Sequence, residues 1–340
     1  MAHIPLISII MPVYNAQNCL ADTLAALVGQ SLESIEIICV DDGSTDNSGA
    51  IIDEFAARDH RIVPIHTPNQ GAYKARETGI DAARGRYIGF CDADDTPHPG
   101  MYESLGNRVL SDSSEMGVCA FQRISSSGTI LSTEMQGLSP SAFDVTSKDG
   151  WLVTINTSLW NKIIRRDVLE KRIRLANPPR VMEDAMLLIS LYPYLSRISF
   201  VDEPLYSYSA PEQSAMSSVD PSEIPLLVES WKLLRRHVSQ AEQDYLPIVD
   251  LAAFIHLRIS APIRMDREKR KNATVVIGAA LDESFPLWKS SPFMSMSYVH
   301  QHRRLLTTFI AHVCCRLHVL DVALDAYNAL TKATGKEIKW

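Results

Sequence analysis

Several features that define common protein classes are missing from this 340-residue sequence. None of its six cysteines forms a CxxC pair, and four lie inside apolar runs, as reduced core residues of cytosolic proteins do. Residues 1–15 have neither a basic start nor a small-residue cleavage site, so we expect no signal peptide. No apolar run reaches the roughly 18–20 residues needed to cross a bilayer. We therefore expect a cytoplasmic protein, either soluble or peripheral on the inner face of a membrane.

An excess of positive charge is also missing. The chain has 40 acidic and 33 basic residues, a net charge of −7, which argues against nucleic acid as a partner. The charge is uneven, because residues 226–340 hold 16 basic and 11 acidic residues. We therefore expect residues 1–225 and 226–340 to have different interaction partners.

The first 100 residues alternate between two kinds of hydrophobic pattern. Short β-branched apolar runs are typical of buried strands, and apolar positions at helical spacing follow each of them. A period near 25–30 residues indicates βαβ units and a mainly parallel sheet flanked by helices. We expect strands at 6–13, 35–40, 61–65 and 87–91 and helices at 18–30, 46–58 and 71–83.

The rhythm changes from about residue 113. Strands are expected at 115–124 and 129–134, a polar loop at 137–149 and a helix at 183–195. After residue 220 the pattern is helical, with no internal repeat. The predicted domains are therefore an α/β domain over 1–220 and a helical region over 221–340. The expected helices of that region are 224–237, 246–259, 267–281 and 303–330.

Polar clusters follow the four predicted strands of the α/β pattern. They are Tyr14-Asn15, Asp41-Asp42, Pro68-Asn69 and the run from Asp92 to Asp95. Because ligands of parallel sheets bind at the carboxyl ends of the strands, these four clusters predict one crevice.

The run FCDADDTP places three carboxylates within four positions, where like charges repel. A solvated acidic turn is one explanation, and a general acid–base pair is another. A divalent-metal site accounts for the cluster better, because Mg²⁺ and Mn²⁺ take oxygen ligands and keep substrate phosphates as partners. Asp42 could accept a hydrogen bond from a uracil-like base, and Arg76 could meet a diphosphate.

Seven segments together resemble the inverting family 2 glycosyltransferases, which have the GT-A fold, a Rossmann-like α/β fold. They lie in order over roughly the first 220 residues, and the order of VDDGSTD, NxGxxxAR and DADD is highly specific. The segments are PVYNAQNCLADTLAALVGQSL (12–32), VDDGSTDNS (40–48), NQGAYKAR (69–76), GRYIGFCDADDTPHPGMYE (85–103), WNKIIRRDVL (160–169), MEDAMLL (182–188) and PLYSYSAPEQSAMS (204–217).

The resemblance implies a reaction and its participants. It implies metal-dependent, inverting transfer of a sugar from a nucleotide-diphospho-sugar, with a UDP-sugar expected, to a hydroxyl of a glycan or lipid-linked acceptor. The expected setting is the biosynthesis of surface polysaccharide, and the expected cofactor is Mn²⁺ or Mg²⁺.

The resemblance also assigns roles to residues. Asp94 would bind the metal, Asp184 would be the catalytic base, and Asp95 would shape the turn or touch the donor sugar. The donor nucleotide-sugar would be bound by Pro12, Tyr14, Asp42, Arg76, Asp92 and Asp94. The acceptor side would be formed by Trp160, Asn161, Lys162 and Glu183.

Other interpretations stay open. Trp160 could be a core residue, and the Glu183-Asp184 pair could be ordinary first-turn charge on a helix. A sugar nucleotidyltransferase usually needs a Gly-rich phosphate loop after the first strand, where this chain has PVYNAQN, and no GxGxxG of a dinucleotide dehydrogenase is found there. A non-catalytic sugar-nucleotide-binding module would be expected to lose the DxD or the Asp184 base, and both are present.

The chain departs from the family pattern at two places. Glu77 stands where relatives often have Asn, and Ser207 and Ser209 stand where many carry a basic residue that reaches the diphosphate. Lys162 is a candidate for the missing charge. The segment 302–320 is apolar with basic flanks, which fits a packed core helix or a helix on an anionic membrane surface. Self-association is a further expectation for the helical region.

Overall fold

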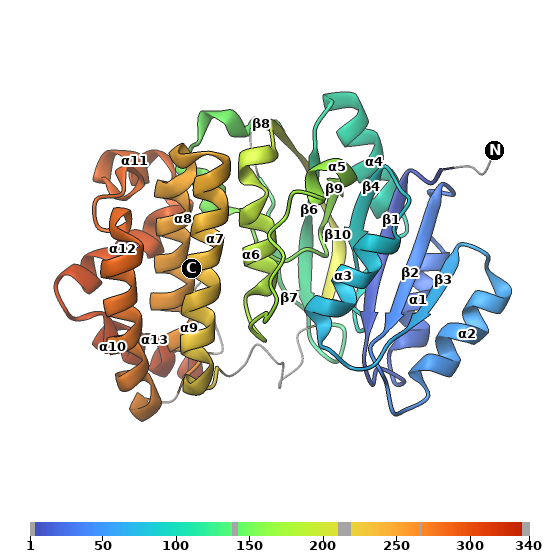
Figure 1. Cartoon of the computed structure of the whole chain (residues 1–340), viewed down its shortest axis with the longest axis horizontal. Helices are drawn as coiled ribbons and strands as arrows, with labels where there is room; N and C mark the ends of the chain where they lie inside the picture. The colour runs from blue at the N-terminus through green and yellow to red at the C-terminus, as the bar shows by residue number, and fades with distance from the viewer. Residues whose placement is uncertain (1–3, 138–141, 210–218, 266, 335–340) are drawn as a thin grey trace. The chain divides into compact units, whose positions relative to one another are not determined.

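The computed structural model describes residues 4–137, 142–209, 219–265 and 267–334 (Figure 1). The chain folds into two compact units, which we call the sheet unit and the helical unit. The predicted boundary at residue 220 does not account for two earlier segments, 147–156 and 173–193, which belong to the helical unit. The sheet unit comprises Met1–Thr146, Thr157–Arg172 and Tyr194–Glu212, and the helical unit comprises Ser147–Asn156, Ile173–Pro193 and Gln213–Trp340.

The sheet unit is built on a ten-stranded sheet in which eight strands follow the order β3-β2-β1-β4-β9-β6-β10-β5, while β7 pairs with β6 and β8 pairs with β10. Strands β1 to β4 are parallel, as predicted, and β9 is antiparallel to both of its neighbours. This arrangement confirms the predicted α/β fold class. The strands are β1 (Ile7–Val13), β2 (Ile35–Asp41), β3 (Ile62–His66), β4 (Tyr87–Phe90), β5 (Thr96–Pro97), β6 (Met116–Ile124), β7 (Ile130–Glu134), β8 (Ala142–Asp144), β9 (Lys162–Arg165) and β10 (Arg197–Ser209).

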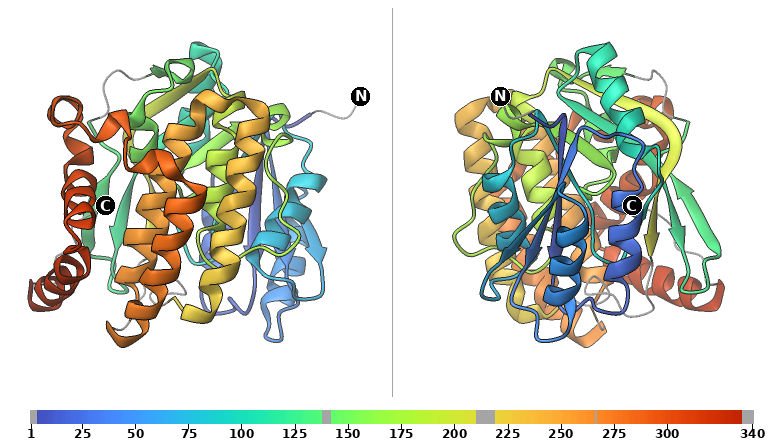
Figure 2. Two further views of the ribbon diagram at one scale, coloured as in Figure 1. Left: turned by 60° about the vertical axis from the view of Figure 1, so that its left-hand side comes forward. Right: turned by 90° about the vertical axis from the view of Figure 1, so that its right-hand side faces the viewer.

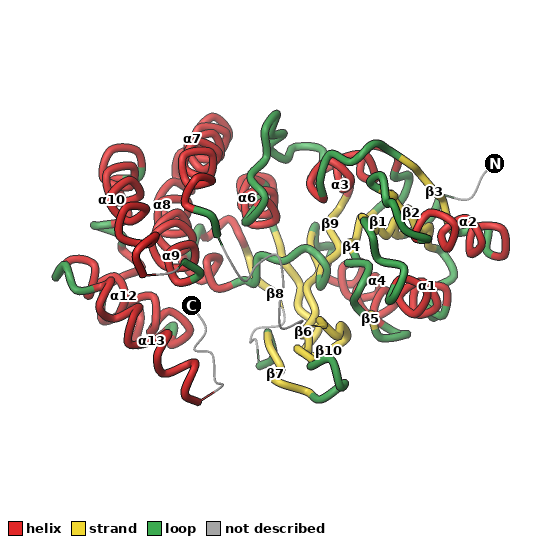
Figure 3. The backbone as a smooth tube through the Cα atoms, turned by 90° about the horizontal axis from the view of Figure 1, so that it is seen from below, coloured by secondary structure: helices red, strands yellow, loops and turns green. Residues whose placement is uncertain are grey.

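Helices cover both faces of this sheet, which is why β1 and β2 are apolar along nearly their whole length. Figure 3 shows α3 on one face and α1 and α4 on the other. A Cβ atom at Gly79 would lie 2.4 Å from Cγ2 of Ile10, so only glycine lets α3 approach β1 this closely. The helices of the sheet unit are α1 (Leu20–Val28), α2 (Ser48–Arg58), α3 (Ala72–Ala82), α4 (Met101–Asp112) and α5 (Arg166–Leu169).

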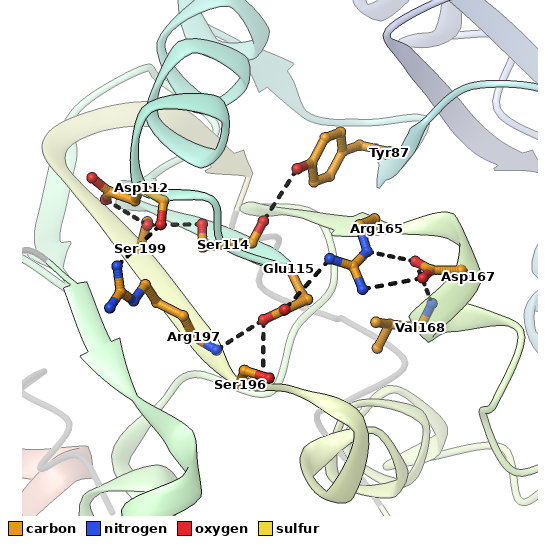
Figure 4. A network of polar contacts seen from close by, with 10 residues as sticks. All are labelled: Tyr87, Asp112, Ser114, Glu115, Arg165, Asp167, Val168, Ser196, Arg197 and Ser199. Atoms are coloured by element: carbon orange, nitrogen blue, oxygen red, sulfur yellow. Dashed lines mark hydrogen bonds and ion pairs between the residues drawn. The ribbon is translucent and has the colours of Figure 1, made fainter.

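A polar network fastens the amino ends of β4, β6 and β10 (Figure 4). One oxygen of the buried Glu115 carboxylate accepts hydrogen bonds from the backbone N–H groups of Ser196 (3.0 Å) and Arg197 (2.8 Å). Its other oxygen lies 3.4 Å from Nη1 of Arg165, and the Tyr87 hydroxyl donates to the carbonyl of Ser114. The network lies at the edge opposite the carboxyl ends of these parallel strands, so we assign it to stability.

A buried ion pair explains the departure at position 77. Glu77 accepts a hydrogen bond from Nε of Arg172, whose side chain is fully buried. A second, more exposed carboxylate, that of Asp81, lies 3.4 Å from the same guanidinium. An amide at position 77 would leave the Arg172 charge with weaker compensation.

We expect Glu77→Leu to lower the free energy of unfolding by about 3–5 kcal/mol, because it leaves the Arg172 charge buried without its closest partner. The double variant Glu77→Leu/Arg172→Met should recover most of this loss. Urea unfolding of the single and double variants measures both values. Glu54→Leu is the control, since the Glu54–Arg58 pair is exposed and contributes less than about 1 kcal/mol. Equal destabilisation of the single and double variants would contradict this account.

The helical unit has its own core. Helix α7 packs against α8 and α10 (Figure 2), and the rings of Phe254 and Trp288 stack at 4.7 Å. The helices of this unit are α6 (Glu183–Ser190), α7 (Ile224–Ala241), α8 (Leu246–Ala253), α9 (Ala261–Ile263), α10 (Arg267–Ser284), α11 (Met296–Gln301), α12 (Leu306–Arg316) and α13 (Leu320–Thr334).

Two expectations for the helical unit were wrong. The predicted helix over 303–330 is two helices, α12 and α13, because the chain turns at His318, whose φ is +59°. The expectation that no apolar run is long enough to cross a bilayer also fails, since the 21-residue helical stretch Gln243–Ile263 qualifies by length and composition. As 67% of its apolar window is buried inside the protein, we interpret it as a core helix.

Candidate active site

The four predicted polar clusters lie at the carboxyl ends of β1 to β4, on one edge of the sheet. Hydrogen bonds join the loop after β1 to the loop after β2: Oδ1 of Asn15 accepts from the backbone N–H of Thr45 at 2.8 Å, and the N–H of Asn15 donates to Ser44. Asn15 has a positive φ of 50°, a conformation that Asn tolerates well. The loops after β1 and β2 therefore contact one another directly, and the crevice stays a prediction.

Asp42 fastens the next loop. One oxygen of its carboxylate accepts from the N–H of Gln70 at 2.8 Å, and the other accepts from the N–H of Gly71 at 2.7 Å. Asp42 is therefore buried and fixed in place, with lone pairs left for a further donor. Tyr14 is 52% exposed beside this edge, and Pro12 is half-buried, so the predicted base-binding residues lie on neighbouring strand ends.

The Asp41 carboxylate, at the end of β2, has a different role. It accepts a hydrogen bond from the N–H of Ser44 and lies 3.1 Å from Nδ1 of His66. Hydrogen bonds to Asp41 and Asp53 raise the pKa of the His66 imidazole. This pair stabilises the loops around the site from the side of β3.

Arg76, on α3, reaches the acidic run after β4. Its Nη2 lies 3.1 Å from Oδ1 of Asp92, and the arginine side chain is largely buried. The pair places a guanidinium beside the acidic run, and the contact of Arg76 with a diphosphate stays a prediction.

The three carboxylates of the DADD turn have different environments. Asp92 is half-buried, Asp94 is exposed and Asp95 is fully buried. Desolvation and the neighbouring Asp92 carboxylate raise the pKa of Asp94, and desolvation together with both neighbours raises the pKa of Asp95 well above its ordinary value. A cation beside Asp94 would relieve this repulsion.

The buried Asp95 holds the turn against β10. Its carboxylate accepts from the Tyr206 hydroxyl and from the backbone N–H of Ser209, both at 2.8 Å. The Tyr206 hydroxyl also accepts from the N–H of Asp92 at 3.2 Å, and Thr23 donates to the carbonyls of Ala93 and Asp95. Of the two alternatives for Asp95, these contacts support the one in which it shapes the turn.

Sequence reasoning missed Tyr206 and Thr23. Both lie inside segments that resemble family motifs, but Tyr206 is more than a hundred positions from the turn that it contacts. Tyr206 lies in β10 directly before Ser207, the position at which many relatives carry a basic residue. The rest of that motif, 210–217, lies outside the described residues.

The predicted acceptor-side residues Trp160, Asn161 and Lys162 are buried, with exposed fractions of 5%, 0% and 0%. The Trp160 ring stacks on Tyr206 at 4.6 Å and on Tyr208 at 5.4 Å. Lys162 Nζ donates to Oδ1 of Asn161 and to the carbonyl of Ser158, both at 2.6 Å. These contacts favour a role in positioning β9 and β10, and a direct acceptor contact stays a prediction.

Glu183 and Asp184 begin helix α6 of the helical unit. Both side chains are half-buried, and Met182 before them has a left-handed conformation with φ of 66°. Asp184 stands in the first turn of this helix. Its predicted role as the base stays a prediction.

The residues around the DADD turn suit a metal that arrives with its substrate. Within the described part of the chain, no group of three or more His, Cys, Asp or Glu side chains is arranged to hold a metal ion. One exposed carboxylate, Asp94, beside a second at Asp92, is the donor set that Mg²⁺ or Mn²⁺ uses when phosphate oxygens supply further ligands.

Comparison with known proteins agrees with this geometry. The glycosyl transferase family 2 profile matches residues 8–173. The uncharacterized glycosyltransferase EpsJ of Bacillus subtilis is 34% identical over 60% of this chain and 61% of its own length. The minor teichoic acid biosynthesis protein GgaB of the same organism is 29% identical over 61% of this chain and 23% of its own. The chain spans about three-fifths of the length of the first of these curated relatives.

A solved structure shows the same fold. The structure of S. aureus TarS 1-349 in complex with UDP has a TM-score of 0.66 and 17% identity, and covers 98% of this chain and 93% of that one. This likeness confirms the predicted GT-A fold. Residues 8–173 match glycosyl transferase family 2, and the chain's relatives include a protein named for minor teichoic acid biosynthesis.

Proposed function

We propose that this enzyme transfers a sugar from a nucleotide-diphospho-sugar to a hydroxyl of a glycan or lipid-linked acceptor, with inversion at the anomeric carbon. The proposed donor is a UDP-sugar. The proposal rests on the carboxyl edge of the sheet, which carries Asp42, the Arg76–Asp92 pair and the exposed residue Asp94. Hydrogen bonds and the ion pair join the segments that carry these residues. UDP in the TarS complex supports the choice of uridine. Relatives of the GgaB type support a setting in surface polysaccharide assembly.

Each residue has a role in this proposal. Tyr14, Pro12 and Asp42 bind the nucleoside, Arg76 contacts the diphosphate, and Asp92 lies near the ribose or the sugar. Asp94 would hold Mn²⁺ or Mg²⁺, which supplies Lewis-acid stabilisation of the leaving diphosphate when bound.

The transfer step is an in-line displacement. The Asp184 carboxylate takes the proton of the acceptor hydroxyl, and the acceptor oxygen forms a bond to the anomeric carbon. The bond between that carbon and the diphosphate oxygen breaks, and the nucleoside diphosphate leaves with the electron pair. The assignment of Asp184 rests on the resemblance of the MEDAMLL segment, and Glu183 would orient the acceptor.

We also propose that the reaction takes place in the cytoplasm. All six cysteines are free, and Cys39, Cys91 and Cys119 are buried. Burial raises the pKa of the Cys39 thiol to about 12, which keeps it protonated and unreactive. Thiols of this kind suit a reducing compartment.

The proposal is tested by the release of nucleoside diphosphate from UDP-, GDP- and CDP-sugars, each with Mn²⁺, Mg²⁺ or EDTA. We expect metal-dependent release from one nucleotide class, with or without added acceptor. A binding module would bind the nucleotide and release nothing under any condition. A chain that neither binds nor hydrolyses any of these donors would contradict the proposal.

Tyr206→Phe should weaken binding of the metal–nucleotide complex roughly tenfold. The variant keeps the stacked ring but removes the hydroxyl that joins the N–H of Asp92 to the Asp95 carboxylate, a loss of about 1–3 kcal/mol at a buried site. Calorimetric titration with UDP and Mn²⁺ measures the affinity. Tyr208→Phe is the matched control, since it removes a hydroxyl from the same aromatic stack. Equal affinities of the two variants would contradict the positioning role of Tyr206.

A further inference from the structure

Helix α12, together with Leu317 directly after it, carries a row of exposed apolar side chains on one side. Leu306, Ile310, Val313 and Leu317, which we call the α12 stripe, are 50%, 51%, 37% and 66% exposed. Their spacing of four, three and four residues places them along one face of a helix. The stripe is therefore an apolar strip that the described residues of the helical unit leave exposed.

The opposite side of α12 is packed against the helical unit. Thr308, Ala311 and His312 are buried there. The His312 ring lies edge-on to the Trp288 ring at 5.5 Å, and its Nε2 lies 3.2 Å from the Trp288 carbonyl oxygen. The helix is thus fixed on one side, and the α12 stripe lies on its exposed side.

The segment of sequence that contains the stripe is rich in positive charge, and it ends at Glu283 before it and Asp321 after it. Residues 284–320 contain no Asp or Glu, and their basic side chains are Lys289, Arg303, Arg304 and Arg316. The three arginines are exposed. An open hollow next to the stripe puts an arginine beside apolar side chains, and it is lined by Met294, Phe309, His312, Val313, Arg316 and Leu317.

We propose that the α12 stripe docks on the surface of an anionic lipid bilayer. Apolar side chains of a surface helix enter the boundary between headgroups and acyl chains, while arginines bind lipid phosphates. Each basic side chain near such a surface adds attraction that salt weakens. The combination of an apolar row, flanking arginines and an acid-free segment matches this partner.

A second copy of the chain fits the same face less well. A two-fold dimer places the same patch on both sides of its interface, so the arginines around one stripe would meet the arginines around the other. Like charges facing each other across an interface are unfavourable. The charge therefore favours the anionic bilayer over self-association.

Co-sedimentation of the full chain with lipid vesicles tests this proposal. We expect binding to phosphatidylcholine vesicles that contain one third phosphatidylglycerol, much weaker binding to phosphatidylcholine alone, and release as salt rises from about 0.1 M to about 1 M. No binding to either kind of vesicle would overturn the proposal. Equal, salt-insensitive binding to both would overturn it as well.

Variants of exposed residues locate the docking surface. Ile310→Ser/Leu317→Ser should weaken vesicle binding at least tenfold, and Arg303→Gln/Arg316→Gln should weaken it roughly 30-fold. Val275→Ser/Val276→Ser on α10 is the matched control, with exposed fractions of 71% and 49%, and should bind like the wild type. Light scattering without lipid measures the molar mass of the protein and so tests whether a second copy of the chain covers the stripe. A dimer that dissociates in Ile310→Ser/Leu317→Ser would overturn the proposal.

Discussion

Asp94→Asn should reduce the metal-dependent release of nucleoside diphosphate at least about 100-fold, a loss of roughly 2.7 kcal/mol of transition-state stabilisation. Asp94 is the one of the three aspartates in the DADD turn that is exposed as a residue, and partial desolvation of its carboxyl group, together with Asp92, raises its pKa. Asparagine has nearly the same shape but no charge, so it should keep the turn while losing the metal. Rates with saturating Mn²⁺ and with EDTA measure the effect.

The control for this prediction is the loss of a carboxylate elsewhere in the sheet unit. Glu54→Gln removes an exposed charge on α2 and should leave the rate unchanged within a factor of two or so. Thermal unfolding of both variants shows whether the fold is intact. A folded Asp94→Asn enzyme with wild-type rates in Mn²⁺ would remove Asp94 from the metal site.

Asp184→Asn should abolish transfer to the acceptor, with a rate loss of about 10²- to 10⁴-fold, while donor binding stays unchanged. The reason is that the proposed base acts on the acceptor hydroxyl and makes no contact with the nucleotide. Measuring UDP affinity in Mn²⁺ beside the transfer rate separates the two effects.

Glu283→Gln, an exposed carboxylate on α10, is the control in the same unit and should affect neither quantity. Equal losses of donor binding and transfer in Asp184→Asn would show that Asp184 supports the structure or the donor and is not the base. A transfer rate like that of the wild type would place the base at another residue.

Local patterns predicted the parts of the structure that depend on neighbouring residues. Strands β1 to β4 and the polar clusters at their ends follow from apolar runs and turn residues within short stretches of sequence. Because parallel strands present their carboxyl ends on one edge of a sheet, these clusters were predicted to lie close together. The connected loops of Asn15, Asp42 and Asp92 are the result.

Long-range pairing was beyond such reasoning. Strand β9 inserts antiparallel between β4 and β6, and 147–156 and 173–193 join the helical unit, because partners far along the chain decide both outcomes. The same holds for side chains. Tyr206 contacts a turn 111 positions away, and Arg172 pairs with Glu77 across 95 positions. A local pattern contains no signal for either contact.

The central claim is that the DADD turn and a nucleoside diphosphate hold the metal together. Calorimetric titrations of UDP, of Mn²⁺ and of UDP with Mn²⁺ test it most directly, on the wild type and on Asp94→Asn. We expect weak binding of Mn²⁺ alone, since the described residues form no three-ligand group, and UDP binding that Mn²⁺ strengthens in the wild type only. UDP affinity that is the same in Mn²⁺ and in EDTA would contradict the claim.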